Sequence, residues 1–158
     1  MPDAAPDRTR RTFAHGRWLM NETRERGLEF FSDVLGKDAG DMMRQAVEQD
    51  GFSSTLGQIA VDFAFGSVWT RPGLERKHRS LVVIAILIAT RQTAELKNHF
   101  RIGLANGLTR TELEEAVIQS IPYLGLPACT QASSALIEVL RERGIDTQSK
   151  TTEERGLV

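Results

Sequence analysis

The sequence predicts an all-α protein built as one helical domain, and three observations support this. Apolar residues recur at helical spacing through most of the chain, no stretch alternates at the period of a strand, and glycine or proline separates the periodic stretches. The 158 residues, of which 41% are hydrophobic and 26% charged, are enough for one buried core. This composition argues against a disordered or membrane-embedded chain.

Three regions follow from the composition. Residues 1–12 are rich in proline, aspartate and arginine, so we expect a disordered N-terminal arm. Residues 13–145 carry the helical periodicity and form the expected domain, and the polar residues 146–158 form an expected loose C-terminal tail. No apolar segment of a secretion signal is visible near the start, which predicts a cytoplasmic protein.

The domain is expected to hold six to seven helices. Ser53 or Ser54 is expected to cap the third helix, which runs towards residue 68. Thr109 and Glu112 have the spacing of a capping box at the start of the sixth, and Pro122 is expected to break that helix. The other predicted helices cover residues 17–35, 39–49, 75–90, 93–105 and 128–143, and the sixth covers 109–121.

The fourth predicted helix contains a continuous apolar run from Leu81 to Ala89, which is too short to cross a membrane. A helix that is apolar on all sides is normally buried on all sides. Because a domain of this size cannot surround such a helix alone, we expect other copies of the chain to cover part of it. The sequence therefore predicts a homo-oligomer.

Charge and cysteine content exclude several classes of protein. With 20 basic and 21 acidic residues the net charge is −1, which argues against a nucleic-acid partner. Cys129 is the single cysteine, so the chain can form neither an internal disulfide nor a Cys-x-x-Cys redox site. We expect Cys129 to lie in the core, although a thiolate at a helix start is the alternative. No cluster has metal-ligand spacing beyond Glu95 and His99, so no metal site is expected.

Glu95 and His99 are the strongest candidates for chemistry. They lie four residues apart on the fifth predicted helix, where side chains share a face and can touch. A carboxylate beside an imidazole fixes its tautomer and raises its pKa, which makes an acid–base pair. The alternative is an ordinary pair on a helix surface.

Candidate substrate-binding residues surround a Pro-Gly turn and a tight connection. Trp69, Arg71 and Arg79 flank the turn, and an arginine fork matches the two oxygens of a carboxylate. The alternative is that Trp69 anchors the core and both arginines are solvated. Tyr123, the single tyrosine, either lines a pocket or closes a corner.

Five blocks follow one another along the chain: Trp69-x-Arg71-x-Gly73-Leu74, Arg79-Ser80-Leu81, Glu95-Leu96-x-x-His99, Asn106-Gly107-x-Thr109 and Tyr123-x-Gly125-x-Pro127-Ala128. In this order they resemble the carboxymuconolactone decarboxylase family, and the resemblance spans residues 16–143. It implies an AhpD-like helical fold that assembles as a ring-like oligomer, with a hexamer or trimer favoured.

The same resemblance separates two branches of the family. One branch contains peroxidase-coupled disulfide reductases, which need Cys-x-x-Cys before the histidine, and here Gln92 and Glu95 stand in those places. A glutamate commonly follows the arginine in that branch, and here it is Ser80. The chain therefore resembles the decarboxylase branch. Phe65 and Leu124 stand where that branch usually has tryptophan and cysteine. We expect both residues to line the pocket and to influence which substrate it accepts.

The resemblance implies a cofactor-independent carboxy-lyase that converts 4-carboxymuconolactone to 3-oxoadipate enol-lactone in protocatechuate breakdown, the β-ketoadipate pathway. The expected partner is thus a small carboxylate or lactone, with no cofactor, nucleic acid or membrane. Two alternatives remain open: another lyase, isomerase or cyclase step on a related substrate, and a non-catalytic helical oligomer or binding module. In the enzyme, proton transfer falls to His99 oriented by Glu95, carboxylate binding to Arg71 and Arg79, and the pocket walls to Trp69 and Tyr123.

Overall fold

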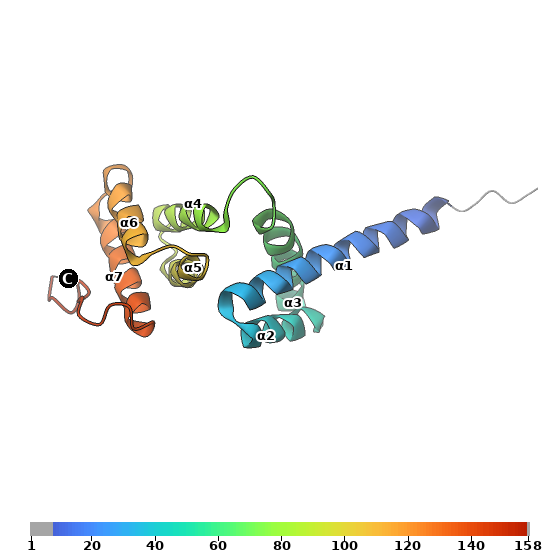
Figure 1. Ribbon diagram of the computed structural model, residues 1–158, viewed down its shortest axis with the longest axis horizontal. Helices are drawn as coiled ribbons and strands as arrows, with labels where there is room; N and C mark the ends of the chain where they lie inside the picture. Colours follow the sequence, from blue (N-terminus) through green and yellow to red (C-terminus); the bar gives the residue numbers. More distant parts are fainter. Residues whose placement is uncertain (1–7, 158) are drawn as a thin grey trace, which may run out of the picture. The chain divides into compact units, whose positions relative to one another are not determined.

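The computed structural model describes residues 8–157, with side chains from residue 22, and over this range it is all-α, as predicted. The described residues form seven α-helices and one π-helix, and Figure 1 labels the α-helices. They divide into two compact units, the first ending at Pro72 and the second beginning at Gly73. The elements are α1 (Arg8–Leu35), α2 (Lys37–Glu48), α3 (Phe52–Ile59), η1 (Ala60–Trp69), α4 (Arg76–Ala89), α5 (Thr93–Ala105), α6 (Arg110–Leu124) and α7 (Leu126–Glu142).

The first helix begins earlier than the sequence predicts. α1 starts at Arg8 rather than at residue 17, so residues 8–12 of the expected disordered arm belong to a helix, while residues 1–7 lie outside the described range. Arginine is a good helix former, and the segment that follows Arg8 contains no proline. Composition alone therefore underestimated this helix. α2 begins at Lys37, directly after Gly36 and two residues before its predicted start.

The third predicted helix is two elements. α3 begins after Gly51, not after a serine cap, and it passes into the π-helix η1, in which hydrogen bonds span five residues. Ser54 lies inside the helix, and its hydroxyl donates back to the carbonyl of Gln49, at the end of α2. The predicted serine cap is therefore wrong.

A close approach of two backbones joins α1 to η1. A Cβ on Gly27 would clash with the carbonyl of Val61, and one on Gly66 would clash with the carbonyl of Thr23. Beside this contact, the Arg24 guanidinium binds the Asp62 carboxylate through two hydrogen bonds of 2.9 and 2.6 Å. The first unit is therefore held by backbone contact and by an ion pair of matched geometry.

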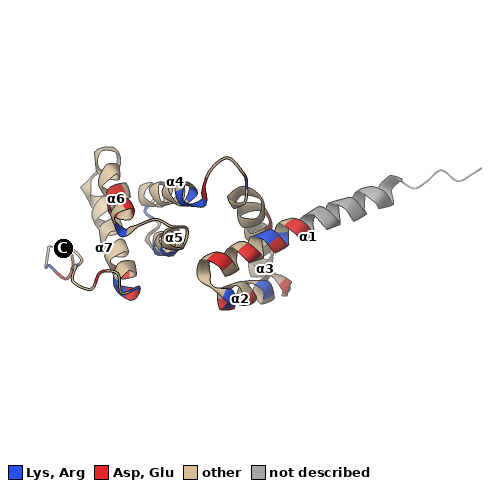
Figure 2. Cartoon of the chain, viewed as in Figure 1, with Lys and Arg blue, Asp and Glu red and all other residues tan. Residues whose placement is uncertain are grey.

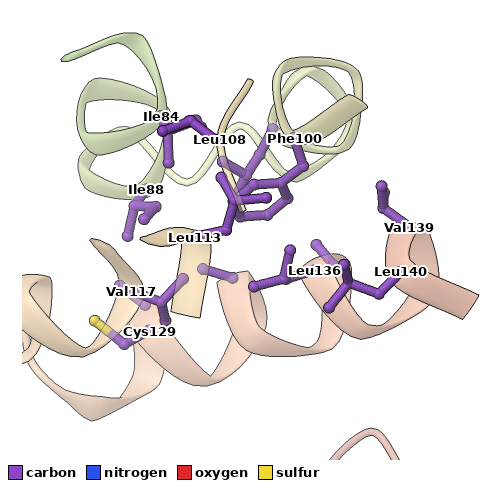
Figure 3. Close-up of a cluster of buried hydrophobic side chains, with 14 residues drawn as sticks. Ile84, Ile88, Phe100, Leu108, Leu113, Val117, Cys129, Leu136, Val139 and Leu140 are labelled. Carbon is purple, nitrogen blue, oxygen red and sulfur yellow. The ribbon is translucent and has the colours of Figure 1, made fainter. Parts of the chain in front are cut away.

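The second unit is built around one apolar core. Figure 3 shows side chains from α4, α5, α6 and α7 converging, with Leu113 in their midst. Phe100, Ile84 and Val139 are fully buried. Cys129 also belongs to this core, as expected, and burial raises the pKa of its thiol. The helix-start thiolate that the sequence left open is therefore disfavoured.

α4 is buried on one face only. Ser80, Ile84 and Ile88 lie inward, whereas Val82 and Ile86 are each 54% exposed within the single chain. The single chain therefore covers one face of α4, and the cover of the other face by further copies stays a prediction. Figure 2 shows that the charges of α4 gather at its first turn, which leaves the rest of the helix uncharged. No helix in the described range is both long and apolar enough to cross a membrane.

The ends of α5 and α6 follow local sequence signals. α5 has the predicted bounds, and the chain leaves it through Gly107, whose φ is +93°. Thr109 and Glu112 form the predicted capping box at the start of α6. α6 continues to Leu124, past Pro122, where a break was predicted. Proline near a helix end removes one hydrogen bond, but its fixed φ still fits the helix.

The segment after residue 145 is not the loose tail that its composition suggests. Asp146 is buried, and its carboxylate accepts hydrogen bonds from the backbone N–H groups of Gln148 and Ser149. It also forms an ion pair with Arg110, in which Nη2 and Oδ2 are 2.9 Å apart. Arg141 of α7 binds Glu154 through both carboxylate oxygens. These contacts fasten the tail to α6 and α7.

Candidate active site

The candidate site is organised along one face of α5. Residues at positions 95, 99, 102 and 106 share that face because they are spaced by four, three and four residues. Ile102 is buried, His99 is half-buried with its Nδ1 atom shielded from solvent, and Glu95 is exposed. The face therefore runs from a solvated carboxylate to a shielded imidazole.

Two opposing effects act on the protonation of His99. Burial lowers the pKa of His99 below its ordinary value of 6.5, and the charge of Glu95 raises it by a smaller amount. The predicted effect of Glu95 is therefore present, but the larger effect of burial was not predicted. A lowered pKa favours the neutral imidazole.

α5 is tied to α4 at the end of the same face. The Asn106 side-chain amide donates a hydrogen bond of 3.1 Å to the hydroxyl of Ser80, which is 0% exposed. Both residues lie in recognisable sequence blocks, but the sequence predicts no role for either. Only the three-dimensional arrangement shows that the Arg-Ser-Leu and Asn-Gly blocks meet.

Two further candidates lie in the same unit as His99. Arg79 is half-buried at the first turns of α4, and its Nε donates to the carbonyl of Leu74 at 3.1 Å. Tyr123 is 78% exposed near the end of α6. Neither residue closes a corner inside the core, so both are accessible to a small ligand or to another protein surface.

The remaining two candidates belong to the first unit. Trp69 is 7% exposed and packs its ring against Phe30 and Phe65, with centroid distances of 5.2 and 6.3 Å. Trp69 is thus a core anchor, the alternative that the sequence left open. Arg71 is exposed, in the turn that follows η1 and precedes Pro72.

A separate pocket of about 270 Å³ lies among α6, α7 and the tail. Its lining includes Val117, Leu136, Leu140 and Asp146, and it contains none of the six predicted site residues. Within the described residues, no three His, Cys, Asp or Glu side chains gather as metal ligands would.

Comparison with known proteins gives a consistent family. The carboxymuconolactone decarboxylase family matches residues 55–138, a range that contains all six candidate residues. A 4-carboxymuconolactone decarboxylase of Acinetobacter baylyi is 38% identical over 121 residues, which are 77% of this chain and 89% of the relative. A nitrosuccinic acid decarboxylase of Metarhizium robertsii is 35% identical over 109 residues, which are 68% of this chain and 74% of the relative.

Proposed function

Because the chain belongs to the carboxymuconolactone decarboxylase family, we propose that it removes CO2 from 4-carboxymuconolactone without a cofactor. The observation that carries this is the 38% identity to a 4-carboxymuconolactone decarboxylase over 89% of that relative. The shielded imidazole of His99 beside Glu95 supplies a group that can move a proton. Two relatives named as decarboxylases favour an enzyme over a non-catalytic binding module.

The substrate supplies its own electron sink. The bond from the ring carbon to its carboxylate breaks, CO2 leaves, and the electron pair passes through the ring double bond to the lactone carbonyl. The resulting dienolate takes one proton on the carbon next to that carbonyl, which gives 3-oxoadipate enol-lactone. The enzyme has to hold the carboxylates, stabilise the dienolate and deliver that proton.

His99 delivers the proton in this proposal. Its lowered pKa favours the neutral imidazole in the free chain, so His99 has to take up a proton before it can act as an acid. A substrate with two carboxylates brings negative charge to the site, which raises the affinity of His99 for a proton. Glu95 adds to this effect and orients the ring.

The arginines bind carboxylate. Arg71 is exposed in its turn, and Arg79 lies at the start of α4, where the helix end also favours an anion. Tyr123 offers an exposed ring as a wall of the pocket. For Trp69 we propose a supporting role, since its ring packs in the core of the first unit and the chain passes from it directly to Arg71.

The test is an assay of the purified chain with 4-carboxymuconolactone, following CO2 release and the loss of lactone absorbance. We expect turnover in the wild type, a loss of roughly 10²–10⁴-fold in His99→Ala and a smaller loss in Glu95→Gln. His78→Ala and Glu48→Gln, both at exposed positions, are the matched controls and should retain turnover. Unchanged turnover in both folded site variants would refute the assignment of the site.

A second candidate is decarboxylation of another dicarboxylic acid. The relative named for nitrosuccinic acid is 35% identical to this chain. In nitrosuccinic acid, as in the lactone, the carbanion left by CO2 is stabilised by a neighbouring acceptor and a second carboxyl group remains. Phe65 and Leu124 depart from the family pattern and are the positions where a different ring or chain would be accommodated. Initial rates with both acids, compared directly, separate the two candidates.

The proposal includes a homo-oligomer, with a hexamer or trimer favoured, and a cytoplasmic location. Apolar side chains that are more than half exposed support the oligomer. They follow helix-face spacing along α3 and η1 and recur on α4, and in a monomer they would form unusual apolar patches. These residues are Phe52, Leu56, Ile59, Phe63, Val82 and Ile86.

A further inference from the structure

The hydrogen bond between Asn106 and Ser80 is a buried polar contact that the proposed chemistry does not use. Ser80 is 0% exposed and Asn106 is half-buried at the last turn of α5. Buried polar groups without a partner are costly, so these two side chains stabilise the fold only in the arrangement in which they meet. A hydrogen bond is also directional, unlike an apolar contact.

The same contact bears on His99 because of helix geometry. Asn106 follows His99 by seven residues, which is close to two helical turns, so the two side chains share a face about 10 Å apart along the axis. Ile102 lies between them on that face and is buried. When Asn106 meets Ser80, the face that carries His99 is therefore turned toward α4.

A second contact, one turn away, leaves little freedom at the crossing of α4 and α5. A Cβ on Gly103 would lie 3.0 Å from Leu108 Cδ1 and 3.4 Å from Ile84 Cδ1, so α5 lies close to Ile84 of α4 at this point. Towards α7, α5 packs through Leu96 and Phe100 in the shared apolar core, and its polar contacts there are surface ion pairs, Lys97 with Glu138 and Arg101 with Glu142. Such partly exposed pairs contribute little to orientation.

We propose that Asn106 and Ser80 are positioning residues: their hydrogen bond fixes the rotation of α5 against α4 and so holds the His99 imidazole on the α4 side, beside the helix whose first turn contains Arg79. An apolar pair at these positions would pack the helices but would not fix their rotation. The catalytic consequence rests on the proposed function, whereas the orientation of His99 does not.

The test compares Asn106→Ala and Ser80→Ala with a matched control, Ser120→Ala. Ser120 is also buried, but its hydroxyl donates to the carbonyl of Ala116 within its own helix, α6. Stability is measured by denaturant unfolding, and the His99 ring is followed by an NMR titration. His99→Gln identifies its signal among the three histidines.

We expect both test variants to shift the His99 titration upward, toward the ordinary histidine value, because a turned helix exposes the ring. We expect kcat to fall roughly ten- to a hundredfold with a smaller change in KM, as a misplaced catalytic group would cause. The double variant should lose no more than either single variant. Ser120→Ala should lose stability while His99 titrates as in the wild type.

An unchanged His99 titration in folded Asn106→Ala, together with a wild-type kcat, would overturn the positioning role. Should Ser80→Ala fail to fold, Asn106→Ala still decides, because its side chain lies at a helix end and is only half-buried. If the wild type turns over neither lactone nor dicarboxylic acid, the proposed function fails, while the titration still decides whether the pair orients His99.

Discussion

At the scale of single residues, the protonation of His99 is set by a competition between burial and charge. Burial lowers its pKa and the carboxylate of Glu95 raises it by less, so the net shift of the pKa is downward. The i, i+4 spacing reveals the pairing but contains no information about burial. This is why the sequence predicted the effect of Glu95 but not the larger effect of burial.

The first prediction concerns the pH dependence of catalysis. Since kcat/KM reports the free enzyme, it should fall as pH rises through the pKa of His99, which lies below 6.5. Glu95→Gln removes the charge that raises this pKa, so the fall of kcat/KM with rising pH should occur at a still lower pH. Rates between pH 4.5 and 8 and the NMR titration of His99 measure both effects. A wild-type fall of kcat/KM above pH 6.5, or an upward shift in Glu95→Gln, would contradict the prediction.

At the scale of elements, the packing of η1 on α1 shows how a tertiary contact sets local structure. The two helices approach through Gly27 and Gly66, and the Arg24–Asp62 ion pair lies beside that contact. The wide turn of a π-helix is rare and is found often at functional sites. Here η1 ends at Trp69, directly before the turn that carries Arg71.

The second prediction tests this approach. Gly66→Ala should destabilise the protein by about 1–3 kcal/mol or more, because its Cβ would meet the backbone carbonyl of Thr23, which cannot move aside. Gly57→Ala is the matched control: its Cβ would lie 3.6 Å from Val47 Cγ1, an ordinary contact, and alanine favours the helix by about 0.5–1 kcal/mol. Denaturant midpoints of the two variants should therefore move in opposite directions.

The third prediction concerns the C-terminal tail. Hydrogen bonds from Ser149 and the Gln148 backbone lower the pKa of Asp146 to about 2, and Arg141 and the Thr151 backbone lower that of Glu154 to about 2. A carboxyl whose pKa is lowered by folding stabilises the folded state at pH values above its ordinary pKa, which is 3.8 for Asp146 and 4.5 for Glu154. This stabilisation is lost as the pH falls through about 2.

Hydrogen exchange should therefore show the tail protected at pH 5 and released as the pH approaches 2. Glu154→Gln, which cannot form the charged pair with Arg141, should release part of the tail already at pH 5. Glu48→Gln serves as a control on an exposed carboxylate of α2. A tail that exchanges freely at pH 5 in the wild type would show that these contacts do not hold it.

At the scale of the whole molecule, each unit has its own interior but leaves apolar surface exposed. The first unit exposes Phe52 at 84% and Phe63 at 66%, and the second exposes Val82 and Ile86 on α4. Large exposed apolar patches often mark interaction sites. The exposed face of α4 in the single chain is the face that the sequence predicted other copies of the chain to cover.

The fourth prediction follows from this surface. Wild-type protein should sediment as an oligomer, well above the 17.6 kDa of one chain. Leu56→Glu and Phe63→Glu should shift it to smaller species without unfolding it, because both side chains are exposed in the single chain. Gln45→Glu, an exposed charge change on α2, is the control. A wild type that sediments as a monomer would refute the proposed assembly.

The sequence by itself determined the features that depend on neighbours along the chain. The all-α class, the bounds of α5, the capping box of α6 and the core position of Cys129 were predicted correctly. Each rests on helical periodicity, on a local hydrogen-bond signal or on the usual burial of a residue type. The family could also be recognised from the sequence, because its motifs lie in order along the chain.

Only the tertiary structure decided the features that depend on distant partners. It showed the π-helix, the burial of α4 on a single face, the fastening of the tail by Asp146 and Glu154, and the lowered pKa of His99. It also brought Ser80 and Asn106, 26 residues apart, into one hydrogen bond. Burial and long-range hydrogen bonds arise from how helices pack against one another. A pattern of neighbouring residues does not predict which distant residue will contact a given side chain.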